Sequence, residues 1–368
     1  MKKKATGSRS KASGKLAARD FGALIAEVRD LIQSARHAAA TTVNTLQVLT
    51  NFEIGRRIVE HEQRGAARAE YGKELLKELS ARLTEEFGKG FSMTNLKLMR
   101  QFFIENRHRI SQKASDQLVI SEKAARKSLN PFILSWSHYV LLLTIKNPEE
   151  RSFYEIEATQ SGWSLSELKR QLASSLYERL ALSRDKKSVR KLAGEGQVLT
   201  RPEDMLKEPY VLEFLGLDEK ASYSESDLEQ AIIDRIEHFL LELGKGFLFE
   251  ARQKRFTFDE DHFFVDLVFY NRLLRCYVLI DLKLDKLTHQ DLGQMQMYVN
   301  YFNRYVKTPE ENPTIGILLC KQKKQAIVEL TLPPDAHIHA KEYQLYLPSK
   351  ELLRQKLLDW TRNQEDGT

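Results

Sequence analysis

The chain has 368 residues, of which 42% are hydrophobic and 29% are charged, and its formal net charge is +6. This is the composition of a globular protein large enough for two domains, and the absence of any apolar run of 18 residues excludes a membrane-spanning protein. Because the first 20 residues also lack the apolar stretch of a signal peptide, we expect a cytoplasmic protein.

The positive charge is concentrated in residues 1–20, which carry seven Lys or Arg and one acid. The rest of the chain carries equal numbers of basic and acidic groups. The composition of this segment predicts a disordered basic tail, which either adds affinity for phosphate groups or is only a solvated terminus. A nucleic-acid surface on the folded body must then come from local clustering of charge.

From 21 to 183, apolar residues recur every three or four positions, which predicts an all-helical domain for DNA binding or protein interaction. Within it, Ser92 is a good N-cap for a helix from 93 to 106. The polar side of that helix carries Thr94, Lys97, Gln101 and, at its margin, Arg100. This helix is either the recognition helix of a helix-turn-helix unit, reading a DNA groove, or a helix with a solvated face.

A second capped helix is predicted to begin at Ser164, where Glu167 completes a capping box. Leucines every three or four positions from 165 to 180 form a seam that is either core or a homodimer contact. The polar, basic segment from 107 to 127 predicts a loop or an insertion. The stretch 184–205, a basic run followed by glycines and a proline, predicts the interdomain linker.

Residues 206–350 form the second predicted domain, and 351–368 a C-terminal helix and tail. The expected elements are a helix (226–243), three strands (247–258, 263–270 and 275–284), a helix (289–305), a strand (314–320), a strand near 343–347 and a helix (349–362). A helix between two strands implies parallel pairing, so the sheet is mixed. Cys276 and Cys320 lie in apolar runs, and we expect buried thiols in a reducing compartment rather than zinc ligands.

Three charged residues interrupt two of the most apolar runs: Asp266 in 263–269, and Asp281 and Lys283 in 276–283. Strand alternation places Asp281 and Lys283 on the same side, and a turn between the runs places Asp266 opposite Asp281 within a residue or two. Burying an unpaired charge costs several kcal/mol or more. Either these groups form a satisfied ion pair in the core, or a divalent cation such as Mg²⁺ or Mn²⁺ lies between the carboxylates.

Glu229 lies within the apolar arc of the helix at 226–243, whereas Glu242 falls on the opposite, charged face. Glu229 therefore either joins the buried polar site or completes a capping box begun by Ser226. On the helix from 289, Gln294 and Tyr298 lie four residues apart on one face and are either packing residues or part of the same site.

Together these residues resemble the PD-(D/E)XK nuclease superfamily. The resemblance is carried by Asp266, the Asp281–Leu282–Lys283 element, Glu229 on the preceding helix, and Gln294 with Tyr298 as in RecB-like members. Val265 stands where the motif has proline, and the second acid is Asp rather than Glu; both variations are tolerated in the superfamily. The resemblance implies a restriction-endonuclease-like domain with an αβββαβ core and a mixed sheet.

The chain is also similar to one family, the YhcG-type bacterial nucleases, over about residues 25–350. Nuclease-domain segments that match are Leu241–Phe247, Asp266–Tyr270, Leu274–Cys276 and Asn312–Gly316. Segments similar to the family's helical N-terminal domain are Tyr71–Lys73, Gly88–Ser92, Leu134–Tyr139 and Gly162–Ser164.

This resemblance implies that Glu229, Asp266, Asp281 and the backbone carbonyl of Leu282 hold one or two Mg²⁺ (or Mn²⁺) ions. It further implies that Lys283 orients the attacking water or neutralises charge on the phosphate, while Gln294 and Tyr298 position the substrate.

The implied function is Mg²⁺-dependent hydrolysis of DNA in bacterial DNA processing or defence. DNA is the expected partner, a homodimer is an open alternative, and neither a membrane nor a small-molecule cofactor is expected. The alternative is a non-catalytic or partner-dependent accessory protein of a restriction or transposition system that keeps the nuclease fold.

Overall fold

The computed structural model describes residues 28–29, 31–32, 42–63, 69–110, 131–184, 186–217, 223–333 and 335–363. It divides the chain into two compact units, Met1–Lys146 and Asn147–Thr368. The predicted basic tail (1–20) and residues 111–127 of the predicted insertion lie outside the described residues. Across the described ranges, no helix has the length and apolar character needed to cross a membrane.

The first unit is helical, as predicted. Its elements are a helix over 42–63, α2 (Ala69–Phe87), α3 (Met93–Asn106), η1 (Arg107–Arg109) and α6 (Trp136–Leu142). The predicted cap of α3 is confirmed, because the Ser92 hydroxyl accepts a hydrogen bond from the backbone N of Asn95 at 3.2 Å. The helix over 42–63 approaches α3 most closely at Gly55, where a Cβ would lie 2.1 Å from the carbonyl oxygen of Met99. Only glycine fits there.

Aromatic rings fill the core of this unit. The Phe102 ring lies 4.9 Å from those of Phe132 and Tyr139, 5.4 Å from Trp136 and 6.2 Å from Phe52, in edge-on and tilted arrangements. Such tight clusters explain why the helices of this unit pack around α3. Trp136 is therefore a packing residue.

The second unit contains a six-stranded mixed sheet of order β1-β6-β5-β4-β3-β2. The strands are β1 (Tyr210–Val211), β2 (Phe247–Phe258), β3 (Asp261–Asn271), β4 (Cys276–Lys286), β5 (Ile315–Gln322) and β6 (Ile338–Gln344). Strands β2, β3 and β4 pair antiparallel, whereas β4, β5, β6 and β1 pair parallel. The predicted mixed sheet is confirmed; β1 and the helix α14 (Gln325–Thr331) were not predicted.

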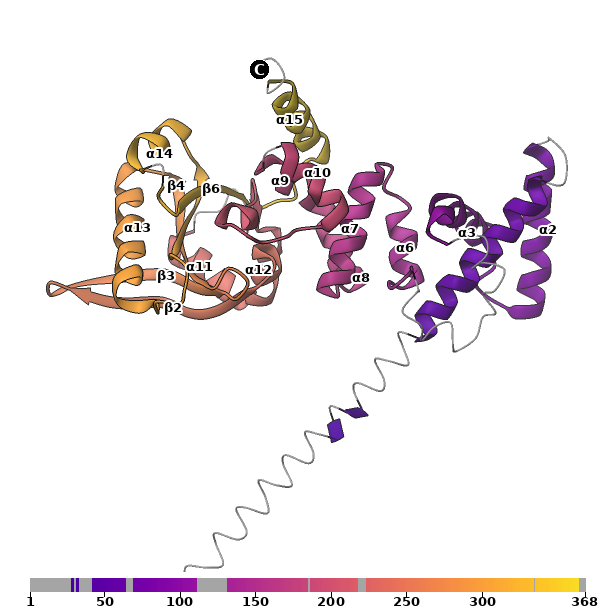
Figure 1. Ribbon diagram of the computed structural model, residues 1–368, viewed down its shortest axis with the longest axis horizontal. Helices are drawn as coiled ribbons and strands as arrows, with labels where there is room; N and C mark the ends of the chain where they lie inside the picture. The colour runs from indigo at the N-terminus through magenta and orange to yellow at the C-terminus, as the bar shows by residue number, and fades with distance from the viewer. Residues whose placement is uncertain are drawn as a thin grey trace, which may run out of the picture. The chain divides into compact units, whose positions relative to one another are not determined.

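Helices cover both faces of this sheet (Figure 1). One face packs on α11 (Glu225–Asp234) and α12 (Ile236–Leu243). The other packs on α13 (His289–Tyr301), which continues as a π-helical turn (Phe302–Val306). Both cysteines lie buried among these apolar side chains, and burial raises the pKa of each thiol to about 12, as expected for inert thiols.

The predicted helix at 226–243 is in fact two helices that meet at Arg235. Its cap is Ser224, whose hydroxyl accepts a hydrogen bond from the backbone N of Asp227 at 3.1 Å, so the capping box predicted for Ser226 and Glu229 is wrong. The prediction that Glu242 is exposed is also wrong, because its side chain is fully buried. A single helical wheel misplaced it because the break at Arg235 changes the phase of the second helix.

The boundary between the units also differs from the sequence prediction, which placed the end of the helical domain at 183. Four helices before the predicted nuclease domain belong to the second unit: α7 (Pro148–Ser161), α8 (Leu165–Ala173), α9 (Leu176–Leu182) and α10 (Lys186–Glu195). The segment 184–205 is not a plain linker, since it contains α10 and the turn η2 (Pro202–Met205).

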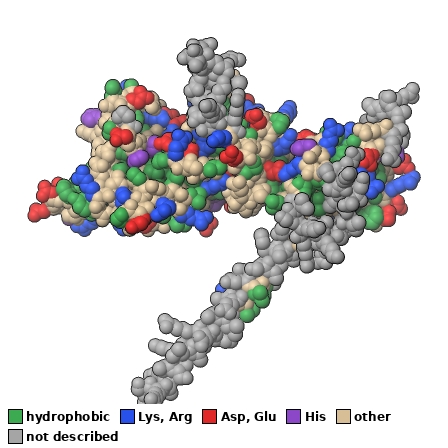
Figure 2. Space-filling model, in the orientation of Figure 1, with side chains coloured by type: hydrophobic (Ala, Val, Ile, Leu, Met, Phe, Trp, Pro, Cys, Tyr) green, Lys and Arg blue, Asp and Glu red, His purple; other side chains and the backbone are tan. Residues whose placement is uncertain are grey.

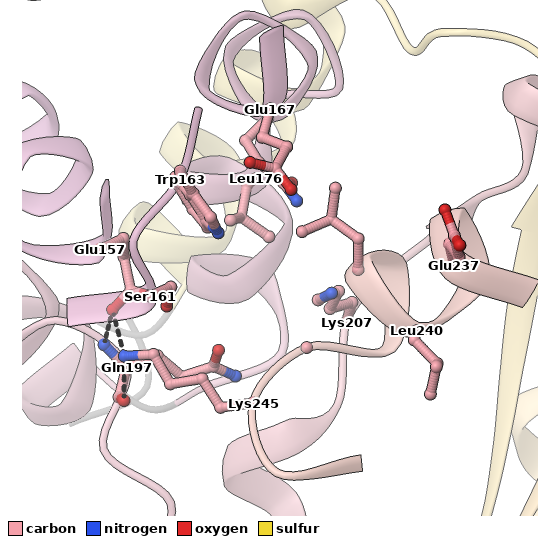
Figure 3. A pocket seen from close by; sticks show the side chains of 13 residues that line it. Glu157, Ser161, Trp163, Glu167, Leu176, Gln197, Lys207, Glu237, Leu240 and Lys245 are labelled. Carbon is pink, nitrogen blue, oxygen red and sulfur yellow. Dashed lines mark hydrogen bonds and ion pairs between the residues drawn. The ribbon is translucent and has the colours of Figure 1, made fainter. Parts of the chain in front are cut away.

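Buried polar contacts explain why these helices stay with the sheet. Arg179 of α9 is fully buried and donates to the Glu242 carboxylate of α12 at 2.5 Å. Glu157 of α7 accepts from Lys245 at 2.8 Å and from the backbone N of Gln197 at 2.6 Å, beside a cavity of about 280 Å³ (Figure 3). Pairs between residues so far apart leave no periodic signal in the sequence.

The predicted capping box of α8 is confirmed: the Glu167 carboxylate accepts from the backbone N of Ser164 at 2.6 Å, and the Ser164 hydroxyl accepts from that of Glu167 at 3.2 Å. The leucine seam does not run along one helix, because α8 ends at Ala173 and Ser175 adopts a left-handed backbone (φ 53°). Leu168 and Leu180 are fully buried in the second unit, which favours the core interpretation of the seam. The C-terminal α15 (Lys350–Asn363) follows the sheet, close to the predicted 349–362.

Candidate active site

Asp266 and Asp281, here called the acid pair, lie where β3 and β4 separate. The register of the two strands ends at Leu267 opposite Ile280, so the acid pair occupies the next position on each strand. From there β3 continues to pair with β2, and β4 with β5. The backbone N of Leu282 donates to the Asp266 carboxylate at 2.9 Å instead of to a strand neighbour. The predicted opposition of the two aspartates is confirmed.

Charge is concentrated at this point. Asp281 is 3% exposed. Burial and the neighbouring Asp266 carboxyl raise the pKa of Asp281, whereas Lys283 lowers it, and the net result is a pKa of about 7. The Lys283 ammonium lies 2.9 Å from the Asp281 carboxylate and 3.6 Å from that of Glu225. Burial acts to lower the pKa of Lys283, but these carboxylates outweigh burial and raise it. The site thus has a negative excess that one ammonium does not neutralise.

Helix α13 brings Gln294 and Tyr298 to the same place. The Gln294 amide donates to the Tyr298 hydroxyl, and Tyr298 is 1% exposed. Burial raises the pKa of Tyr298, the hydrogen bond from Gln294 lowers it, and the charges of Asp281 and Asp266 raise it again. The structure therefore brings together Asp266, Asp281, Lys283, Gln294 and Tyr298.

Glu229 does not contact the acid pair directly, because the Gln253 side chain lies between Glu229 and Asp266. Glu229 is 3% exposed and accepts hydrogen bonds from Arg252 and, at 2.5 Å, from the Gln253 amide. The same Gln253 amide donates to the Asp266 carboxylate at 3.0 Å. Glu229 is thus linked to the acid pair through Gln253 and paired with Arg252, rather than in direct contact with the aspartates.

Sequence reasoning missed Gln253 and Arg252. Gln253 adopts a left-handed backbone (φ 45°) within β2, between residues that pair with Leu267 and Val265 and therefore facing Asp266. Such a conformation is rare for a non-glycine residue and concentrates at functional sites. A weak signal was present: 252–255 is a run of four polar residues inside a strand.

The donor set fits a divalent cation. Within the part of the chain that the structure describes, no group of three or more His, Cys, Asp or Glu side chains could hold a metal ion. Mg²⁺, however, is usually bound through one or two carboxylates, with waters and substrate phosphates completing its shell. The acid pair supplies such oxygens, and burial together with the repulsion from Asp266 raises the pKa of Asp281, so a bound cation would stabilise the ionised pair.

On α3, the four residues predicted to read DNA differ in their surroundings. Thr94 and Lys97 are exposed. Arg100 is paired with the Glu62 carboxylate at 2.7 Å, and the Gln101 amide donates to Glu105 at 2.9 Å. Two of the four side chains are therefore engaged within the protein.

Residues 203–358 match the model of the YhcG PDDEXK nuclease domain, and residues 27–179 match that of the DUF1016 N-terminal domain. Over 353 residues the chain is 40% identical to the Escherichia coli (strain K12) protein named "Putative nuclease YhcG", covering 92% of this chain and 93% of that relative. The chain belongs to the YhcG family. Its acid pair lies within the matched nuclease domain of that family.

Two solved structures show a partial likeness to this YhcG-family chain. A repair endonuclease from Pyrococcus abyssi is 18% identical with a TM-score of 0.24, and the EndoMS–dsDNA2 complex is 15% identical with a TM-score of 0.25. Each match covers 36% of this chain, and it spans about half of the other chain (50% and 51%). At these TM-scores the likeness carries no further argument, and the restriction-endonuclease-like fold rests on the sheet, its helices and the family.

Proposed function

We propose that this YhcG-family chain is a Mg²⁺-dependent nuclease that hydrolyses phosphodiester bonds of DNA, in bacterial DNA processing or defence. The observation that carries the proposal is the acid pair. Two carboxylates adjoin where two strands separate, one of them is buried with a pKa near 7, and Lys283 lies beside it. Phosphodiester hydrolysis needs this combination of anionic metal ligands and a cation.

Asp266, Asp281 and the carbonyl of Leu282 would hold the cation. When bound, it would lower the pKa of a water molecule and offset charge on the phosphate and the leaving oxygen. Lys283 keeps its proton because Asp281 and Glu225 raise its pKa, so its ammonium can donate to the attacking water or to a phosphate oxygen.

The surrounding side chains position these groups. Gln253 fixes the Asp266 carboxylate by a hydrogen bond and is itself held by Glu229. Tyr298, held by Gln294, lies buried near the acid pair, and the two would together help to position the substrate strand. We propose Glu229 as a positioning residue rather than a direct ligand.

Helix α3 is proposed to contribute to DNA targeting through the exposed Thr94 and Lys97. Arg100 and Gln101 would act by holding the helix to its neighbours. Phosphate contacts of this kind add affinity and fix orientation without reading sequence.

A second candidate is a nuclease that depends on a partner protein. In this candidate Glu229 is a direct ligand of the cation, and the partner would first have to break the ion pair between Glu229 and Arg252. Cleavage by the isolated chain would argue for the first candidate.

The test is incubation of the full chain with labelled single-stranded, duplex and branched DNA, and with RNA, in Mg²⁺, Mn²⁺ or EDTA. Asp281→Asn should lower cleavage roughly 100-fold or more without lowering the melting temperature in EDTA, because it removes a buried carboxylate that the neighbouring, half-buried Asp266 repels. The matched control is Asp359→Asn, an exposed aspartate on α15. Cleavage that persists in EDTA, or in the Asp281→Asn protein, would overturn the proposal.

A further inference from the structure

A groove of about 350 Å³ lies between β2 and α13, and four of the nine described residues that line it are aromatic. We call it the aromatic groove and define it by Phe256, Phe258, Tyr301, Arg304 and Tyr305. Its volume lies at the lower end of the range for small-ligand pockets, roughly 300–1,000 Å³. It is large enough for one planar ring system with its substituents.

The rings of the groove form a layered wall. Phe256 and Tyr301 stack with centroids 4.1 Å apart and planes 21° apart, and Tyr305 continues from Tyr301 at 5.2 Å. Phe258 is 57% exposed and Tyr305 is 63% exposed, although both are apolar over most of their surface. Exposed aromatic groups gathered in this way mark a binding surface.

The polar groups of the groove suit a nucleobase and its phosphate. Of the nine described residues that line it, Arg304 alone is charged. The Gln296 amide oxygen at the groove is buried and has no hydrogen-bond partner within the described residues. A rotation of the Gln296 side chain toward the groove would let this oxygen accept from an exocyclic amino group of a base, while the Arg304 guanidinium attracts a phosphate.

The groove continues directly from the candidate active site. The Phe256 ring contacts that of Tyr298 edge-on at 5.5 Å, and Tyr298 lies beside the acid pair. Figure 1 shows α13 crossing the β2–β3 hairpin, so one helix presents both the groove and the residues of the site. Figure 2 shows acidic side chains at its left end, where Figure 1 places the tip of the β2–β3 hairpin. The tip residues Asp259, Glu260 and Asp261 would repel phosphates and so bound this path.

We infer that the aromatic groove holds an unstacked base of the DNA strand that is cut at the acid pair, and that the substrate is therefore single-stranded or locally unpaired DNA. The inference rests on the proposed nuclease function. In a duplex each base face is covered by its neighbours, so a base reaches the groove only when it is unpaired and unstacked.

The first test measures binding without cleavage, in EDTA, by fluorescence anisotropy of a labelled oligonucleotide, either single-stranded or fully paired. Combining Phe258→Ala and Tyr305→Ala should weaken single-strand binding roughly ten-fold or more, since stacking on aromatic side chains contributes much of such binding. Duplex binding should change by less than two-fold. The control combines Phe264→Ala and Tyr346→Ala, which remove two other exposed rings (45% and 47% exposed) outside the groove.

The second test measures cleavage of the same two substrates in Mg²⁺. The native chain should cut the single strand faster than the duplex, and the groove variant should lose that preference. Equal single-strand binding by the groove and control variants, or an equal loss for both substrates, would overturn the inference while leaving the nuclease proposal standing. Absence of metal-dependent cleavage by the native chain would instead overturn the proposed function.

Discussion

At the scale of single residues, the geometry of the acid pair depends on Gln253. Its amide is shared between Glu229 and Asp266, and its backbone occupies the left-handed region where a strand residue is normally extended. The cost of that conformation, of order 1–3 kcal/mol, persists only because neighbouring contacts hold it. We interpret this strain as serving the orientation of Asp266.

Replacing Gln253 by Asn should test that interpretation. Asn tolerates the left-handed backbone but is one methylene too short to reach both carboxylates. We expect cleavage to fall roughly 10–100-fold and the Mg²⁺ concentration for half-maximal rate to rise, as for other groups that orient metal ligands. Gln355→Asn on α15 is the matched control. An unchanged metal requirement would show that Gln253 is only structural.

At the scale of elements, the polar face of α3 is exposed in one part and paired with neighbouring side chains in another. Thr94 and Lys97 remain exposed, whereas Arg100 is 40% exposed in its ion pair with Glu62. An exposed ion pair contributes little to stability but restricts the arginine side chain. The two basic residues of one helix should therefore differ in their effect on DNA.

Lys97→Ala should weaken DNA binding several-fold and reduce the slope of log affinity against log salt concentration by about one, since one phosphate contact is lost. Arg100→Ala should change that slope less, because Arg100 is already paired with Glu62. The measurement is a salt titration by anisotropy, with Lys77→Ala on α2 as the control. Equal slopes for Lys97→Ala and Lys77→Ala would remove α3 from the DNA-binding surface.

At the scale of the second unit, a buried charge network fastens helices to the sheet. The Glu242 carboxylate of α12 accepts from Arg179 of α9, from Arg170 of α8 at 3.4 Å, and from the backbone N of Val211 in β1 at 3.0 Å. Burial acts to raise the pKa of Glu242, but Arg179, Lys207 and Arg170 outweigh it and lower the pKa to about 2. The network therefore needs Glu242 to be ionised.

Glu242→Gln should lower the free energy of unfolding by about 3–5 kcal/mol at pH 7, because it leaves a buried arginine without its counter-charge. Since the pKa of Glu242 is lower in the folded chain than its ordinary 4.5, its contribution is fully present above pH 4.5 and is lost as the pH falls towards 2. Urea unfolding from pH 7 to pH 3 measures both effects. Glu237→Gln, at an exposed position on the same helix, should change neither the free energy of unfolding at pH 7 nor its dependence on pH. Equal changes in the two variants would contradict the role of Glu242 in the network.

The sequence by itself determined the order of the strands from β2 to β6, the caps at Ser92 and Ser164, and the opposition of Asp266 and Asp281. Each of these depends on periodicity, on residues three or four apart, or on two strands joined by a short turn. All of these signals involve residues that are close together in the sequence. Family resemblance added the expected chemistry, but not the arrangement of the side chains.

Tertiary structure alone decided the rest. Glu229 meets Gln253 across 24 positions and Arg179 meets Glu242 across 63, and no local pattern encodes such pairs. These contacts keep the helices α7 to α10 with the sheet, bury a glutamate that a helical wheel exposes, and place Glu229 behind Gln253. The physical reason is that a buried charge finds its partner in space, whichever part of the chain supplies it.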